Sequence, residues 1–94
     1  FVNPPYSQIG LWVEKCYRES GIDTTVVLLV PSRTDTKWWH KYIMEANKIF
    51  FIKGRLKFNN SKNSAPFPSA VVVFGYDEFG GGFPEIDTIE KPNE

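Results

Sequence analysis

The chain has 94 residues, of which 41% are hydrophobic and 16% aromatic, and its formal net charge is zero. This length corresponds to one small domain, and the single cysteine, Cys16, excludes an internal disulfide and favours a reducing, cytoplasmic setting. The longest apolar run, residues 26–31, is far too short to span a membrane, and we see no basic leader followed by an apolar stretch.

Phe1 and Val2 are predicted to end a strand, and Ser7 is a suitable N-cap for a helix after it. Apolar residues then recur with the spacing of one helical face, and Gly21 is expected to stop the helix. These apolar residues are Ile9, Trp12, Val13, Cys16 and Tyr17. Residues 24–31 are a β-branched apolar run without alternation, which is typical of a strand covered on both faces.

A second helix is expected after this strand, with Thr34 or Asp35 as its cap. Its predicted buried stripe consists of Trp39, Tyr42, Ile43 and Ala46. Residues 49–58 then predict a strand with a break near Gly54, and residues 59–68 have the composition of a loop. Residues 69–74 predict another apolar strand.

The order strand, helix, strand, helix, strand, strand predicts an α/β fold. We expect the first three strands to be parallel, the last two to pair as an antiparallel hairpin, and helices to cover both faces in three layers. Because the first strand would expose an unpaired apolar edge, we expect a missing N-terminal half or another subunit to cover it. Residues 1–75 form this α/β part in our prediction, and residues 76–94 form an acidic, flexible tail.

Charge is unevenly distributed along the chain. Residues 1–75 contain ten Lys and Arg against five Asp and Glu, whereas residues 76–94 contain one against six. Between Arg33 and Lys62, eight basic residues are interleaved with six aromatic residues. This composition is typical of a nucleic-acid-binding surface, and the alternative is a solvated basic face beside a separate core.

Two stiff polar corners follow predicted strands. They are Asn-Pro-Pro-Tyr at residues 3–6 and Pro-Ser-Arg-Thr-Asp at residues 31–35. In an open parallel sheet, ligands bind beyond the carboxyl ends of the strands, so we expect a site where these corners meet. The alternative for the tetrapeptide is an ordinary strand-to-helix turn with a capping Asn.

The tetrapeptide, followed by a helix and an apolar strand, resembles the catalytic motif of amino-methyltransferases that use S-adenosylmethionine. The likeness extends over four segments, namely FVNPPYSQIGLWVEKCY, TVVLLVPSRTDTKWWHKYI, IFFIKGRLKF and APFPSAVVVF. Together they resemble the phage and prophage DNA N6-adenine methyltransferases of the Dam type, over about residues 1–75. The resemblance implies part of a Rossmann-like methyltransferase sheet, S-adenosylmethionine as cofactor, DNA as partner, and the cytoplasm of a bacterial or phage-infected cell.

The motif residues Asn3, Pro4, Pro5 and Tyr6 match the chemistry of methyl transfer to an aromatic amine. Such an amine is a poor nucleophile because its lone pair is delocalised into the ring. Acceptors from the Asn3 side chain and the Pro4 backbone carbonyl would localise that lone pair, most strongly as positive charge develops on nitrogen. Tyr6 would stack on the target base, which offsets part of the cost of removing that base from a duplex.

The same resemblance implies that the chain is the C-terminal, acceptor half of the enzyme, because the family's main donor-binding segment lies upstream of the motif. Residue 1 is already next to the motif, so most of the donor pocket is expected to be missing. Contact with S-adenosylmethionine would come from Asn3 and Pro4.

Four basic residues are predicted to contact nucleic acid. Arg33 is a candidate phosphate contact, with an ion pair to Asp35 as the alternative. Lys53, Arg55 and Lys57 alternate and could share one strand face along a DNA backbone, or form a solvated edge.

Two further features of the sequence concern a proline-flanked segment and the residues that could bind a metal. Residues 65–68, Ala-Pro-Phe-Pro, either shape the rim of the target pocket or form a stiff loop. One histidine and one cysteine predict no metal site.

Other functions compete with DNA methylation. Within the same class, the acceptor would be RNA or a protein glutamine amide, although the basic stretch favours nucleic acid. In other classes, the chain would be a non-catalytic nucleic-acid-binding module, or a structural fragment that folds only with a partner.

Overall fold

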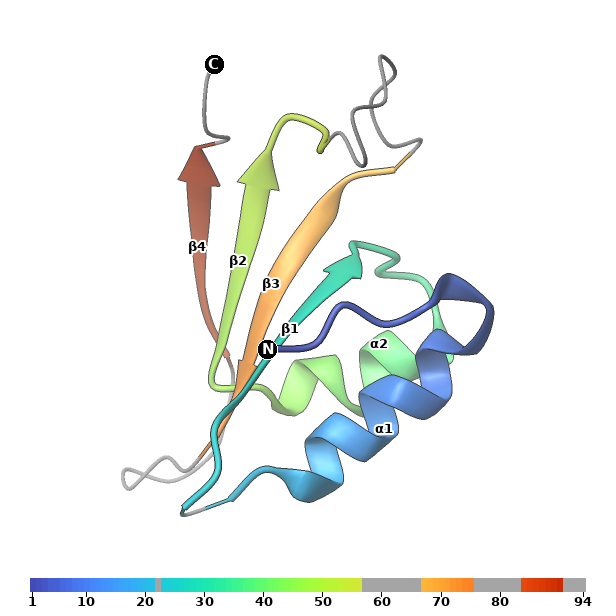
Figure 1. Ribbon diagram of the computed structural model, residues 1–94. Coiled ribbons are helices and arrows are strands. Elements are labelled where there is room, and N and C mark those ends of the chain that lie inside the picture. Colours follow the sequence, from blue (N-terminus) through green and yellow to red (C-terminus); the bar gives the residue numbers. More distant parts are fainter. Residues whose placement is uncertain (22, 57–66, 76–83, 91–94) are drawn as a thin grey trace.

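The computed structural model describes residues 1–21, 23–56, 67–75 and 84–90 (Figure 1). A helix, a strand and a second helix are followed by three more strands, with short 3-10 turns before the first helix and after the second. The elements are η1 (Tyr6–Gln8), α1 (Ile9–Glu19), β1 (Val26–Pro31), α2 (Lys37–Lys41), η2 (Ile43–Glu45), β2 (Lys48–Lys53), β3 (Ser69–Phe74) and β4 (Glu85–Glu90).

The four strands form one mixed sheet in the order β1-β3-β2-β4. Strand β3 runs antiparallel to both of its neighbours, which confirms the predicted antiparallel pairing of the strands near residues 49–58 and 69–74. Strands β1 and β2 point the same way, as predicted, but β3 separates them. The predicted first strand is reduced to a single parallel bridge between Val2 and Leu28. This α/β arrangement is compatible with part of a methyltransferase-like sheet.

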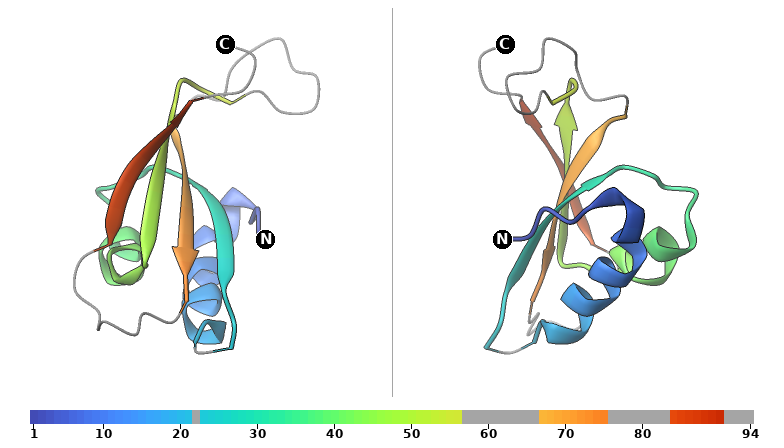
Figure 2. Two further views of the ribbon diagram at one scale, coloured as in Figure 1. Left: turned by 90° about the vertical axis from the view of Figure 1, so that its left-hand side faces the viewer. Right: turned by 45° about the vertical axis from the view of Figure 1, so that its right-hand side comes forward.

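Within the described residues the fold has two layers, so the prediction of three layers is wrong. Both helices cover the same face of the sheet (Figure 2). The reason lies in the strand order. The chain steps from Val2 to β1 and on to β2 in one direction across the sheet, and two crossovers of the same hand then place both helices on one side.

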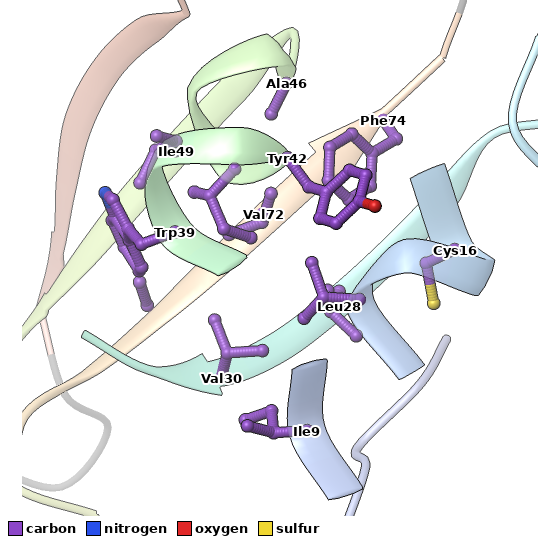
Figure 3. Packing of buried hydrophobic residues seen from close by; sticks show 13 residues of the cluster. Ile9, Cys16, Leu28, Val30, Trp39, Tyr42, Ala46, Ile49, Val72 and Phe74 are labelled. Atoms are coloured by element: carbon purple, nitrogen blue, oxygen red, sulfur yellow. The ribbon is translucent and has the colours of Figure 1, made fainter. Parts of the chain in front are cut away.

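One apolar cluster fills the space between the helices and the sheet (Figure 3). The predicted burial of Trp39, Tyr42, Ile43 and Ala46 is confirmed, although only Trp39 lies within α2. The stripe predicted for α1 is confirmed only in part, because Trp12 and Tyr17 remain 37% and 38% exposed. The cluster comprises Ile9, Val13, Cys16, Leu28, Val30, Trp39, Tyr42, Ile43, Ala46, Ile49, Ala70, Val72 and Phe74.

Helix α1 begins and ends differently from the prediction. Ser7 lies inside η1, and Gln8 occupies the N-cap position without a side-chain hydrogen bond. At the other end, the extended backbone of Ser20 stops the helix, and the Ser20 hydroxyl donates to the Tyr17 carbonyl at 2.8 Å. Gly21 is therefore not the residue that stops it, and instead pairs with Thr24.

Helix α2 is a single short turn capped by Thr36, whose hydroxyl accepts from the Trp39 amide at 3.3 Å. Thr34 and Asp35, the predicted caps, precede it. The helical segment is shorter than predicted because the chain tightens into η2 after Tyr42.

The prediction of a flexible acidic tail is wrong for residues 85–90, which form strand β4, parallel to β2. Lysines of β2 compensate its acidic side chains: Lys48 pairs with Glu85 at 3.8 Å and Lys53 with Glu90 at 3.6 Å. Residues 76–83 and 91–94 lie outside the described part of the chain. Of the helices in the described ranges, none is long and apolar enough to cross a membrane.

Candidate active site

The Asn-Pro-Pro-Tyr segment lies beside the carboxyl end of β1. The Val2 amide donates to the Val27 carbonyl at 2.8 Å, and the Leu29 amide donates to the Val2 carbonyl at 2.9 Å. Pairing then stops, as expected from two prolines that have no backbone N–H to donate. The segment therefore leaves the sheet directly after Val2.

The prolines make this corner stiff. Pro4 is buried, and Pro5 takes the N-cap position of η1 with φ −66° and ψ 139°. The Gln8 amide closes the turn on the Pro5 carbonyl at 3.3 Å. The corner thus presents the side chains of Asn3 and Tyr6 outward, and both residues are exposed.

Asn3 and Pro4 carry the two oxygens that the sequence predicts to bind the amine, and Asn3 is exposed whereas Pro4 is buried. Among the described residues, no hydrogen bond engages the side-chain amide of Asn3 or the backbone carbonyl of Pro4. Neither oxygen therefore has a hydrogen-bond partner among the described residues. No described neighbour fixes the orientation of the Asn3 amide by a hydrogen bond.

Three segments far apart in the sequence meet around Tyr6. The rings of Tyr6 and Phe67 make an edge contact, with centroids 4.9 Å apart and planes at 83°. The Arg33 guanidinium lies over the Phe67 ring, with Cζ 5.6 Å from its centroid. A backbone hydrogen bond from the Ser32 amide to the Pro68 carbonyl, at 2.9 Å, ties the last two segments together.

Phe67 belongs to the segment for which the sequence left two alternatives, a pocket rim or a stiff loop. Its contact with Tyr6 favours the rim. The available signal was the pair of prolines that flank Phe67, which stiffen the chain on both sides of the ring.

The electrostatics of the site centre on Arg33 and Tyr6. In the part of the chain that the structure describes, no carboxylate pairs with Arg33, so the alternative ion pair with Asp35 is not formed there. Partial burial raises the pKa of the Tyr6 hydroxyl, and the positive charge of Arg33 partly opposes that rise. The Tyr6 ring is therefore neutral at physiological pH, which suits stacking.

The other predicted DNA contacts are more dispersed. Lys53 ends β2 and pairs with Glu90 at 3.6 Å. Gly54, with φ 88°, then turns the chain, so Arg55 lies past the strand and does not share an alternating strand face with Lys53. Lys57 lies outside the described residues.

No group of three or more His, Cys, Asp or Glu side chains within the described ranges could hold a metal ion. Cys16 lies in the core, and burial raises the pKa of its thiol, which keeps the sulfur protonated and unreactive.

Comparison with known proteins identifies the family. A family model described as DNA N-6-adenine-methyltransferase (Dam) matches residues 1–78. No curated protein and no solved structure matches the chain. The matched region contains the Asn-Pro-Pro-Tyr corner, both helices and strands β1 to β3, whereas β4 lies beyond it. The chain belongs to the Dam family of DNA N-6-adenine-methyltransferases.

Proposed function

We propose that this chain provides the acceptor side of a methyl transfer from S-adenosylmethionine to the exocyclic amine of adenine in DNA. The observation that carries the proposal is the stiff corner at residues 3–6, which holds two acceptor oxygens without hydrogen-bond partners among the described residues beside an exposed aromatic ring. The family match supports the reaction class.

Asn3 and Pro4 would bind the amine. The Asn3 side-chain oxygen and the Pro4 backbone oxygen each accept one N–H of the amino group. These hydrogen bonds favour a pyramidal nitrogen with a localised lone pair, and they strengthen as positive charge develops there, so they lower the barrier rather than only binding the base. Asn3 and Pro4 would hold the amine toward bound S-adenosylmethionine, which would supply the electrophilic methyl group and leave as S-adenosylhomocysteine, while the methylated nitrogen would lose one proton to water.

Tyr6 would stack on the extruded base, and Pro5 would keep the ring in place by stiffening the turn before it. Stacking on an aromatic side chain offsets part of the few kcal/mol needed to take a base out of a duplex. Lys53, Arg55 and Lys57 would contact phosphates, whereas the Arg33 guanidinium lies against the Phe67 ring. The enzyme would meet its DNA substrate in the cytoplasm of a bacterial or phage-infected cell.

The edge of the sheet beside Val2 would be covered by a preceding part of the same enzyme or by another subunit. The single bridge from Val2 to β1 leaves Phe1 82% exposed at this edge. A covering segment would also complete the pocket for the methyl donor.

The test is a transfer assay on the gene product that contains this sequence, with labelled S-adenosylmethionine and adenine-rich duplex DNA. We expect label in N6-methyladenine, and its loss in Asn3→Ala. Parallel reactions with RNA and with protein substrates separate the other acceptors. Label in either of these and not in DNA contradicts the proposal, and DNA binding without binding of the donor identifies a non-catalytic module.

A further inference from the structure

Arg33 lies where it can control the geometry of the aromatic pair at the rim. Its guanidinium is 5.6 Å from the Phe67 centroid, within the range of an attractive cation–π contact. Phe67 in turn contacts Tyr6, so the three side chains form a continuous series that begins at the carboxyl end of β1.

The backbone of Arg33 is fixed on both sides. Its amide donates to the Pro31 carbonyl at 2.8 Å. Its carbonyl accepts from both the amide and the hydroxyl of Thr36, at 3.2 Å and 2.7 Å. A side chain that begins from such a fixed point is a suitable anchor for a neighbouring ring.

Tyr6 needs such an anchor. It is 44% exposed and belongs to a three-residue turn with no buried residue of its own, so little else restricts its ring. A base that stacks on Tyr6 requires a defined ring plane, and the edge contact from Phe67 supplies one.

We propose that Arg33 is a positioning residue that acts through Phe67, holding the Phe67 ring against Tyr6 so that Tyr6 presents a fixed surface to the target base. This inference rests on the proposed function, because it assigns the stacking surface of that same site. It differs from a phosphate contact in its path, since the guanidinium acts on a protein ring and not on DNA.

The pKa of the Tyr6 hydroxyl reflects the proximity of Arg33. Arg33 lowers the pKa of Tyr6 against the larger, raising effect of partial burial. Loss of the guanidinium should therefore raise the pKa of Tyr6 further, which a titration of the Tyr6 ring signals would detect independently of DNA and of catalysis.

The test is a double-mutant cycle with Arg33→Gln, Phe67→Leu and the combined variant. The probe is a single-stranded oligonucleotide with one 2-aminopurine, whose fluorescence is quenched when the base stacks. We expect each single variant to weaken binding and quenching about two- to fivefold, and the combined variant to be no worse than Phe67→Leu alone. Arg33→Lys, which keeps the charge but not the planar group, should restore part of the loss.

Salt dependence separates the two roles of Arg33. A phosphate contact to single-stranded DNA contributes about 0.7 to the slope of log affinity against log salt, whereas a positioning residue leaves that slope unchanged. Lys41→Gln is the matched control, because Lys41 lies over the ring of Tyr42 at 5.3 Å and its loss should not alter the Tyr6 signals.

Additive losses from Arg33→Gln and Phe67→Leu, together with a slope reduced by about 0.7, would overturn the inference. So would unchanged Tyr6 ring signals in Arg33→Gln, with Arg33→Lys as the second variant if the first fails to fold. Failure of the proposed function has a different signature, in which the wild-type protein transfers no methyl group while the Arg33–Phe67 coupling persists.

Discussion

The two edges of the sheet are built in different ways. At one edge Val2 makes a single bridge to β1, prolines end the pairing, and polar and aromatic side chains point outward. At the other edge β4 pairs with β2 along its whole length, and two of its three acidic side chains pair with lysines. At the first edge the pairing ends after one bridge, whereas at the second edge a six-residue ladder joins β4 to β2.

The two edges also owe their stiffness to different interactions. The first edge depends on the buried ring of Pro4 and on the core beneath it, and the second depends on a backbone ladder with every residue of β4 exposed. Substitutions in the core should therefore disturb the first edge far more than substitutions in β4 disturb the second.

The largest effect is expected from Leu28→Ala. Leu28 is fully buried, pairs with Val72 in β3 and bridges to Val2. Loss of the buried side chain leaves a cavity and should lower the free energy of unfolding by about 3–5 kcal/mol, measured by urea denaturation.

The control for this change is Ile86→Ala in β4, where the side chain is 57% exposed. Its expected cost is below about 1 kcal/mol, since little apolar surface is lost from the core. Equal costs for the two variants would contradict the distinction between the edges.

Asn3→Ala should have the next largest effect, on catalysis and not on stability. Removal of the acceptor oxygen should reduce kcat about 100- to 1000-fold, the range seen when one preorganised electrostatic contact to a transition state is lost. Because the Asn3 side chain is exposed and has no described hydrogen-bond partner, the urea midpoint should not change.

Asn3→Asp is the matched variant, since its carboxylate keeps an acceptor oxygen at the same position. It should retain at least about tenfold more activity than Asn3→Ala. Equal activities of the two variants would show that the acceptor at residue 3 contributes little.

Tyr6→Ala should weaken stacking of the target base. Base stacking on an aromatic side chain is worth about 1–3 kcal/mol, or about 5- to 150-fold in affinity for the 2-aminopurine probe. Tyr6→Phe keeps the ring and should remain within about threefold of the wild type. A large loss in Tyr6→Phe would mean that the hydroxyl, and not the ring, carries the interaction.

Much of the first edge could be predicted from the sequence because its signals are local. Two consecutive prolines end strand pairing wherever they occur, and apolar spacing gave the buried face of the second helix. The Tyr6–Phe67 contact was harder, since its partners are far apart in the chain and only the strand order brings them together.

Strand β4 could not be predicted because the composition of residues 85–90 is unfavourable for a strand. Acidic residues are depleted in strands, and Ile86 and Ile89 lack the alternation of a half-buried strand. The segment pairs because the edge of β2 and its lysines meet it in space. The one-sided helices follow from the single direction in which the chain crosses the sheet from Val2 to β1 and β2, and that direction is set by long-range strand pairing.

The smallest effect is expected from Lys53→Gln, at the point where the β4 edge approaches the predicted DNA contacts. The pair with Glu90 spans 3.6 Å between side chains that are 74% and 75% exposed. Such a pair is worth less than about 1 kcal/mol, so the urea midpoint should hardly move.

Glu90→Gln breaks the same pair but keeps the cation, and it therefore separates the structural role of Lys53 from a DNA contact. If Lys53 contacts a phosphate, Lys53→Gln should reduce the salt slope of duplex binding by about 0.9, while Glu90→Gln should leave the slope at its wild-type value. Unchanged salt slopes in both variants would limit the role of Lys53 to its ion pair with Glu90 of β4. DNA would then be bound at the proline corner, with β4 completing the sheet at the opposite edge.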